Sequence, residues 1–157
     1  SLLMIILSTY KYGMAYKTKY KPLNESKYVG DPTNIICRSL WERKVCKYLD
    51  TNKNIRKWGS EELSIPYISP VDRRRHLYYP DFIVEVVQKG GGLRTKLIEV
   101  KPYKQTQEPV RGNKRKKTYL NECATYLVNT AKWEAAKNFC KKNDWDFVIM
   151  TEKDLFQ

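Results

Sequence analysis

The sequence predicts one α/β or α+β domain in which a central mixed β-sheet is flanked by helices. Two observations predict this class. The chain has 157 residues, the length of one ordinary domain, and 41% of them are hydrophobic. Helical periodicity gives way to a series of short β-rich segments, followed by more helical periodicity and a final apolar strand. Neither an internal repeat nor a second domain is evident.

Charge is the strongest compositional signal. Thirty Lys and Arg residues against 17 Asp and Glu residues give a formal net charge of +13. Such an excess attracts polyanions, so nucleic acid is the expected partner, with an acidic membrane or protein surface as the alternative. A mean hydropathy of −0.66 argues against an integral membrane protein. An aromatic content of 13% argues against a simple disordered tail.

The beginning of the chain divides into two parts. Residues 2–7 are apolar but shorter than the roughly 20 residues of a membrane helix. They also lack the flanking features of a secretory signal peptide. We expect residues 1–13 to be an upstream extension or an expression remnant, and residues 14–157 to form the domain. Its N-terminal arm, residues 14–37, is basic and turn-rich, and would lie over the domain or reach to a partner.

The first predicted helix spans residues 39–49. Ser39 is a suitable N-cap, and Glu42 stands at the third helical position, as in a capping box. The apolar stripe of this helix consists of Trp41, Val45 and Tyr48. These residues predict that one side of the helix packs on the sheet.

The middle of the chain changes to strand patterns. Two short candidates, residues 55–58 and 63–68, are followed by a turn. A longer candidate at residues 77–87 is rich in aromatic and β-branched side chains. Three consecutive glycines then predict a hairpin loop before a returning strand at residues 96–100, which Pro102 ends.

The last third begins with a basic loop at residues 101–117. A helix at residues 118–143 follows, with a break near Asn129 as an alternative. Residues 147–150 are predicted to form a buried strand, and residues 151–157 a tail. The four cysteines form no C-x-x-C pair and the chain has one His, so a common zinc site is not expected. Reduced, buried thiols are expected, although an even number leaves two disulfides open.

The candidate chemistry lies where two predicted strands meet. Asp81 stands in one strand, and Glu99, Val100 and Lys101 end the next. Side chains alternate along a strand, so Glu99 and Lys101 share a face, and hairpin pairing would bring Asp81 to Glu99. Paired carboxylates suit Mg²⁺ or Mn²⁺. A lysine beside a metal-bound water can orient or deprotonate it and stabilise charge on phosphate.

This pattern of Pro80-Asp81, seventeen residues, and Glu99-Val100-Lys101 resembles the PD-(D/E)XK nuclease superfamily. The resemblance implies a restriction-endonuclease-like αβββαβ core. Further segments occur in order from Met14 to the C-terminus: Lys27-Tyr28-x-Gly30-Asp31-Pro32, Arg38-Ser39-x-Trp41-Glu42, Trp58-Gly59-Ser60-Glu61, Ile65-Pro66-Tyr67, Asn129-Thr130-x-Lys132-Trp133 and Thr151-Glu152. Together they resemble the head-completion nucleases of T4-like tailed phages and, more distantly, the end-cleaving subunits of Tn7-type transposases.

The resemblance implies roles for five residues. Asp81 and Glu99 would be metal ligands, with the Val100 carbonyl as a third, and Lys101 would be the catalytic lysine. Glu42 would be an accessory acid. The implied activity is Mg²⁺-dependent DNA endonuclease cleavage, with Mn²⁺ as a substitute and 5′-phosphate products. The exonuclease signature of some members is not evident.

The resemblance also implies a setting. The protein would act at the end of packaged phage DNA before tail attachment. It would contact portal or neck proteins and pass from the host cytoplasm into the virion. A homodimer is an open expectation, because many nucleases of this fold cut both strands as dimers.

Each candidate also has a purely structural interpretation. Glu42 could only cap its helix, and Asp81 could only bond a backbone amide at a strand end. Glu99 and Lys101 could form a simple ion pair. Glu85 is interpreted as solvated or salt-bridged. Alternation places Tyr79 on the face of Asp81, where it would stack on a base or pack.

Two basic segments are predicted to contact DNA phosphates. The first is a predicted hairpin tip with Arg73, Arg74, Arg75 and His76; the second is the loop with Lys104, Arg111, Lys114, Arg115, Lys116 and Lys117. Solvated loops are the alternative. Contacts to phosphate alone would select DNA structure rather than sequence. The rival functions are a structural DNA-binding neck protein with a vestigial site, and a transposase or repair nuclease.

Overall fold

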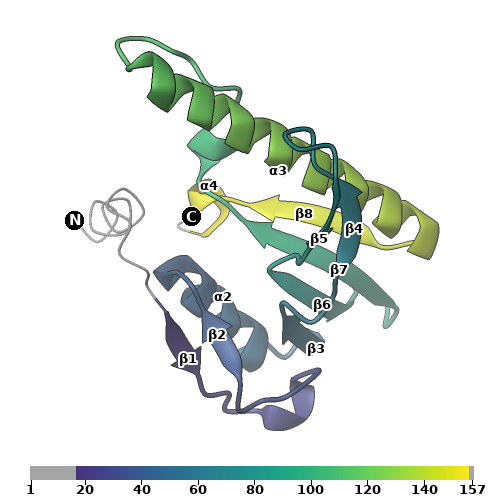
Figure 1. Ribbon diagram of the computed structural model, residues 1–157. Coiled ribbons are helices and arrows are strands. Elements are labelled where there is room, and N and C mark those ends of the chain that lie inside the picture. The colour runs from purple at the N-terminus through teal and green to yellow at the C-terminus, as the bar shows by residue number, and fades with distance from the viewer. Residues whose placement is uncertain (1–16, 156–157) are drawn as a thin grey trace.

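A four-stranded mixed sheet forms the centre of the computed structural model, which describes residues 17–155 (Figure 1). The expectation for residues 1–13 falls outside this range. The strand order is β3-β6-β7-β8, with β8 parallel to β7 and the other pairs antiparallel. The strands span Ile55–Ser60 (β3), Phe82–Val87 (β6), Leu93–Val100 (β7) and Asp146–Met150 (β8). The predicted hairpin between β6 and β7 is confirmed, although β7 begins three residues earlier than predicted.

Helix α2 (Leu40–Thr51) covers one face of the sheet and helix α3 (Lys116–Asn143) covers the other (Figure 1). The two faces carry separate hydrophobic clusters, one around Trp58 and one around Trp133. The stripe predicted for α2 is partly wrong, because Tyr48 is exposed and Leu49 is buried in its place. Positions separated by four residues stay on one side of a helix, so Leu49 extends the line of Trp41 and Val45.

Helix α3 is continuous, so the alternative of a break near Asn129 is wrong. Asn129 is buried inside the helix, and the Thr130 hydroxyl donates to the Tyr126 carbonyl, one turn earlier. Before α3 lies the short 3₁₀ helix η2 (Tyr103–Thr106), and after β8 lies the short helix α4 (Glu152–Leu155). Among the described helices, none combines the length and the apolar character that crossing a membrane requires.

The single strand predicted over residues 77–87 is wrong. The chain leaves β5 (Arg75–Tyr78) before Pro80 and enters β6 only at Phe82. Proline has no amide hydrogen for a strand ladder and restricts the residue before it, so Pro80 separates the two strands. Strand β5 instead pairs with β4 (Ile65–Ile68) as a separate antiparallel hairpin beside α3.

The N-terminal segment packs on the domain, the first of the two alternatives for the arm. Strand β1 (Thr18–Tyr20) pairs with β2 (Ile35–Cys37), and the 3₁₀ helix η1 (Glu25–Lys27) lies between them. The Cys37 thiol is fully buried, with its Sγ 3.5 Å from the Sγ of Cys46. All four cysteines are free thiols, and three of them are buried as expected, whereas Cys123 is half-buried.

Candidate active site

Asp81 and Glu99 lie at the same end of the sheet, Asp81 directly before β6 and Glu99 within β7. Phe82 pairs with Ile98, so one step further along this register places Asp81 opposite Glu99. The Asp81 carboxylate accepts a hydrogen bond from the Val100 amide through Oδ2 at 2.7 Å. This is the backbone contact of the structural interpretation. Among residues 17–155 no hydrogen bond reaches Oδ1, so that oxygen can accept a further contact.

Glu99 is held on both sides. The Tyr78 hydroxyl donates to its Oε2 at 2.5 Å, and the Lys101 ammonium lies 3.4 Å from its Oε1. The Glu99 side chain is only 8% exposed and that of Lys101 17% exposed. The ion pair is therefore no simple surface pair. Alternation along β7 placed Glu99 and Lys101 on one face, as predicted, while Ile98 and Val100 pack on the α2 side.

The carboxylates of this end of the sheet repel one another. Burial raises the pKa of Asp81 well above its ordinary value, and the charges of Glu99 and Glu42 raise it further. Burial, followed by the charge of Glu61, also raises the pKa of Glu42. The Val100 amide and the Lys101 ammonium act in the opposite direction on the Asp81 pKa. Local donors do not fully compensate this negative charge. The carboxylates at this end of the sheet therefore favour the binding of a cation.

The oxygen donors of the site are of the kind that suits hard cations such as Mg²⁺ and Mn²⁺ rather than zinc. Over the described part of the chain, no three His, Cys, Asp or Glu side chains are grouped to hold a metal ion. Mg²⁺ is often bound by only one or two carboxylates, with water and substrate phosphate as the other ligands. The pair of Asp81 and Glu99, with the Val100 carbonyl beside them, suits that mode of binding. Glu42 is not grouped with them as a third ligand.

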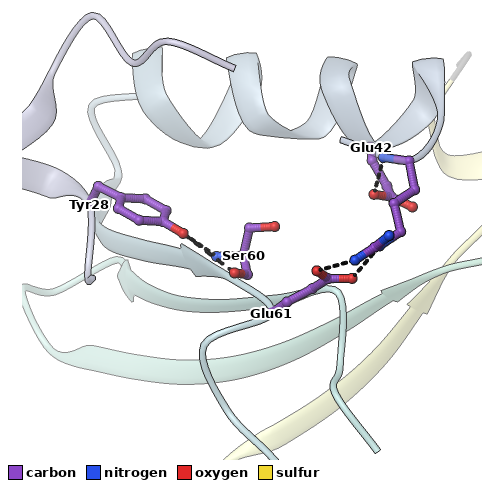
Figure 2. Close-up of polar contacts among 5 residues, drawn as sticks. Tyr28, Glu42, Ser60 and Glu61 are labelled. Carbon is purple, nitrogen blue, oxygen red and sulfur yellow. Dashed lines mark hydrogen bonds and ion pairs between the residues drawn. The ribbon is translucent and has the colours of Figure 1, made fainter. Parts of the chain in front are cut away.

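Glu42 caps the start of α2, as the structural interpretation predicted (Figure 2). Its amide donates to the Ser39 hydroxyl at 3.1 Å, and its carboxylate accepts from the Arg38 amide at 2.9 Å. The Arg38 guanidinium in turn donates to both carboxylate oxygens of Glu61, at 3.0 and 3.3 Å. The charge of Glu42 therefore acts on the pKa of Asp81, while its carboxylate is hydrogen-bonded to the Arg38 backbone amide.

Tyr28 fixes the strand end from which Glu61 follows (Figure 2). Its hydroxyl accepts from the Ser60 amide at 3.1 Å and donates to the Glu62 carboxylate at 2.8 Å. Ser60 is the last residue of β3. The N-terminal segment thus supports the rim of the site, a contact between distant parts of the chain that local patterns do not reveal.

Two residues of the site were missed by sequence reasoning. Tyr79, which alternation placed beside Asp81, is 49% exposed, and Tyr78 enters the site instead. Lys132 on α3 lies with its Nζ 5.8 Å from the ring centroid of Tyr78. Burial lowers the pKa of Lys132, and the charge of Lys101 lowers it further. No local pattern marks Lys132, because its position at the site depends on how α3 packs.

The predicted DNA-binding residues differ in their surroundings. The three arginines of the hairpin tip are exposed, while His76 is paired with Asp72 at 2.7 Å. In the loop, Lys114 is paired with Glu122 at 2.6 Å and holds the loop to α3. The remaining basic side chains of the loop are exposed: Lys104, Arg111, Arg115, Lys116 and Lys117. Glu85 forms an ion pair with Arg56, as predicted.

Comparison with known proteins identifies the family of the chain. Residues 52–152 match the family described as TnsA-like endonuclease, N-terminal, a span that is more than half of the chain and includes Asp81, Glu99 and Lys101. The chain is also 40% identical over 146 residues to the head completion nuclease of Enterobacteria phage T4, covering 90% of this chain and 95% of that protein. The observed architecture, a mixed sheet with helices on both faces, is consistent with both matches. The chain therefore belongs to the TnsA-like endonuclease family and has a restriction-endonuclease-like fold.

Proposed function

We propose that this protein is a metal-dependent endonuclease that hydrolyses phosphodiester bonds of DNA at Asp81, Glu99 and Lys101. One observation carries the proposal: an acid pair faces across β6 and β7, with the Lys101 ammonium 3.4 Å from Glu99. Membership of an endonuclease family and a net charge of +13 support DNA as the substrate.

Each residue has a role that follows from its position. Asp81, Glu99 and the Val100 carbonyl would hold Mg²⁺ or Mn²⁺, which supplies Lewis acidity and a water of lowered pKa when bound. The Lys101 ammonium orients the attacking water and stabilises the charge that develops on the phosphate. Tyr78 fixes the Glu99 carboxylate. Lys132 adds positive charge on the side of α3.

The DNA substrate follows from the basic surface. The exposed basic residues of the hairpin tip and the loop are suited to phosphate, which carries no base sequence. We therefore expect little sequence preference. The resemblance to PD-(D/E)XK nucleases implies products with 5′-phosphate ends. Free ends, flaps and branches are the favoured targets.

The biological setting is proposed from the T4 relative, whose name is head completion nuclease. In that setting the protein would process or guard the end of packaged DNA before tail attachment. It would contact portal or neck proteins and pass from the host cytoplasm into the virion. Quantitative mass spectrometry of purified virions should find it at a fixed stoichiometry. A transposase or repair nuclease would be absent from virions, and sedimentation would show whether the active form is a homodimer.

Cleavage assays test the chemistry. Supercoiled plasmid and branched oligonucleotides should be cut with Mg²⁺ or Mn²⁺ and remain intact in EDTA. Lys101→Met and Asp81→Asn should reduce the rate about 10²-fold or more, because they remove groups that act on water or phosphate. Glu85→Gln is the matched control, since Glu85 lies on β6 but pairs with Arg56, and it should retain the wild-type rate.

A different result would favour the structural alternative. If wild type cuts no substrate with either metal, while all variants retain salt-sensitive DNA binding, the protein is a DNA-binding neck component with a vestigial site. If cutting persists in Lys101→Met and Asp81→Asn, the active site lies elsewhere.

A further inference from the structure

A large surface cavity, open to solvent on one side, lies between the basic loop and the N-terminal half of α3. Its volume is about 1130 Å³. Residues 102–110 form one wall, and one side of α3 between residues 118 and 129 forms the other. Figure 1 shows this half of α3 (green) extending beyond the central sheet, with the loop running beside it. The chemistry proposed for Asp81, Glu99 and Lys101 makes no use of this space.

The cavity adjoins the active site at both walls. On the loop, the lining begins at Pro102, the residue directly after Lys101. On the helix, the lining ends at Asn129, which stands one turn before Lys132 on the same side of α3. The cavity therefore begins next to Lys101 on the loop and next to the turn of α3 that carries Lys132.

The lining is suited to bases rather than to phosphate. The Tyr126 ring and neutral side chains such as Gln105, Asn121 and Thr125 line the walls. The lining carries no net charge, because its two lysines, Lys104 and Lys114, are balanced by Glu108 and Glu122. Lys114 pairs directly with Glu122 at 2.6 Å. Aromatic rings and amides contact bases by stacking and by hydrogen bonds to their edges. The volume exceeds the range of about 300–1,000 Å³ typical of small-ligand pockets, so a single phosphate would leave most of it empty.

Positive charge also lies outside the cavity. Arg111, Arg115, Lys116 and Lys117 are exposed on the loop and the first turn of α3, where they can follow a phosphate backbone. This charge favours a nucleic acid over an apolar or basic peptide as the occupant. In a duplex the bases are stacked and paired, so their faces and edges are available to such a cavity only in an unpaired strand.

We propose that this cavity binds an unpaired DNA strand leading away from the scissile phosphate. The proposal rests on the proposed endonuclease function and narrows its substrate to DNA with a single-stranded arm, such as a flap or a frayed end. The strand would stack on Tyr126 inside the cavity while its phosphates lie toward the basic rim.

Binding of a fluorescein-labelled oligothymidine of about ten nucleotides, measured by anisotropy in EDTA with the full chain, tests the proposal. Thr125→Glu places a negative charge on the cavity wall, where it repels a DNA strand, and Tyr126→Ala removes the stacking ring. Each should weaken single-strand binding about tenfold, which for Tyr126→Ala is the effect of losing one stacked base. The matched control is Leu127→Glu, because Leu127 is 54% exposed on α3 and does not line the cavity. It should bind within about twofold of wild type. Circular dichroism confirms that the variants are folded.

Wild-type affinity in both variants would overturn the proposal. So would an equal loss for the oligonucleotide and for a duplex of the same length, because that result indicates general contact with DNA. A strand containing 5-iododeoxyuridine should cross-link to residues 102–129, whereas cross-linking only elsewhere would also refute the proposal. These measurements need no catalysis, so an inactive protein that still binds single strands through the cavity would contradict the proposed function alone.

Discussion

At the scale of single residues, the buried charge of Asp81 lowers the stability of the protein when no metal is bound. Its pKa is raised by burial and by the charges of Glu99 and Glu42, so its ionised form costs folding free energy. Asp81→Asn removes that charge and keeps an oxygen for the Val100 amide. In EDTA at neutral pH the variant should melt about 2–4 °C higher than wild type, which corresponds to roughly 1 kcal/mol.

The sign of the pH dependence follows from the same shift. A carboxyl with a raised pKa in the folded state is protonated there before it is in the unfolded chain, so it destabilises less as pH falls through its folded-state pKa. The difference in Tm between Asp81→Asn and wild type should therefore shrink on acidification. Scanning calorimetry from pH 8 to pH 5 measures it. A variant that melts below wild type at pH 8 would show that the repulsion is absent. Added Mg²⁺ should raise the Tm of wild type more than that of the variant.

The sequence was sufficient for those residues of the site that depend on local geometry. Glu99 and Lys101 follow from alternation within one strand, and Asp81 follows from a hairpin whose glycine loop is visible in the sequence. Tyr78 and Lys132 do not follow from local patterns. Their positions depend on the path of β5 and on the packing of α3, which are set by contacts between distant segments.

At the scale of elements, the largest error in prediction was the continuous strand over residues 77–87. Its composition favours β structure throughout, yet Pro80 ends one strand and the chain changes sheet before Phe82. The break has a consequence for function. It releases Tyr78 from the alternation of β6, so its hydroxyl can reach Glu99. Composition predicts that strands form here, but the partner of each strand is decided by packing.

The attachment of the N-terminal segment depends on one buried side chain at the end of α2. Asp50 is fully buried and accepts hydrogen bonds from the Tyr20 hydroxyl, the Leu23 amide and the Asn24 amide, at 2.7–3.0 Å. Asp50→Ala would leave these three donors without their acceptor. The Tyr20 hydroxyl is buried, so leaving it unsatisfied costs about 1–3 kcal/mol, whereas the two part-buried amides lose about 1 kcal/mol each. The free energy of unfolding should therefore fall by about 3 kcal/mol.

Urea unfolding followed by circular dichroism measures the effect of Asp50→Ala. Glu25→Ala is the control, because Glu25 is an exposed acid of the same segment, in η1, and its loss should change stability by less than about 0.5 kcal/mol. A loss below about 1 kcal/mol for Asp50→Ala would show that the segment is held mainly by its apolar contacts. Ile35 and Cys37 are the fully buried residues that would provide them.

At the scale of the whole molecule, two hydrophobic clusters lie on opposite faces of one sheet, and the acid pair lies at the end of the strands they share. The cluster on the α2 side includes Ile98 and Val100, and the cluster on the α3 side includes Leu97. Packing on both faces of β7 therefore holds Glu99 rigidly. The loop that follows β7 and the β4–β5 hairpin both lie along α3, so the two basic segments flank one helix.

The salt dependence of DNA binding should show which basic segment contacts the phosphates. Each phosphate contact contributes about 0.9 to the slope of log affinity against log salt for duplex DNA. Substituting the exposed loop residues Arg111, Arg115, Lys116 and Lys117 with Ala should reduce the magnitude of this slope by about 3–4, if all four contact phosphates. Substituting the hairpin arginines Arg73, Arg74 and Arg75 should reduce the magnitude of the slope by about 2–3.

The control is the double variant Lys47→Ala with Lys53→Ala. It also lowers the net charge, but on α2 and the turn after it, away from α3, so it should leave the slope unchanged. Equal small changes in all three variants would mean that the charge of +13 acts only as a general field, and that the solvated interpretation of both segments is correct.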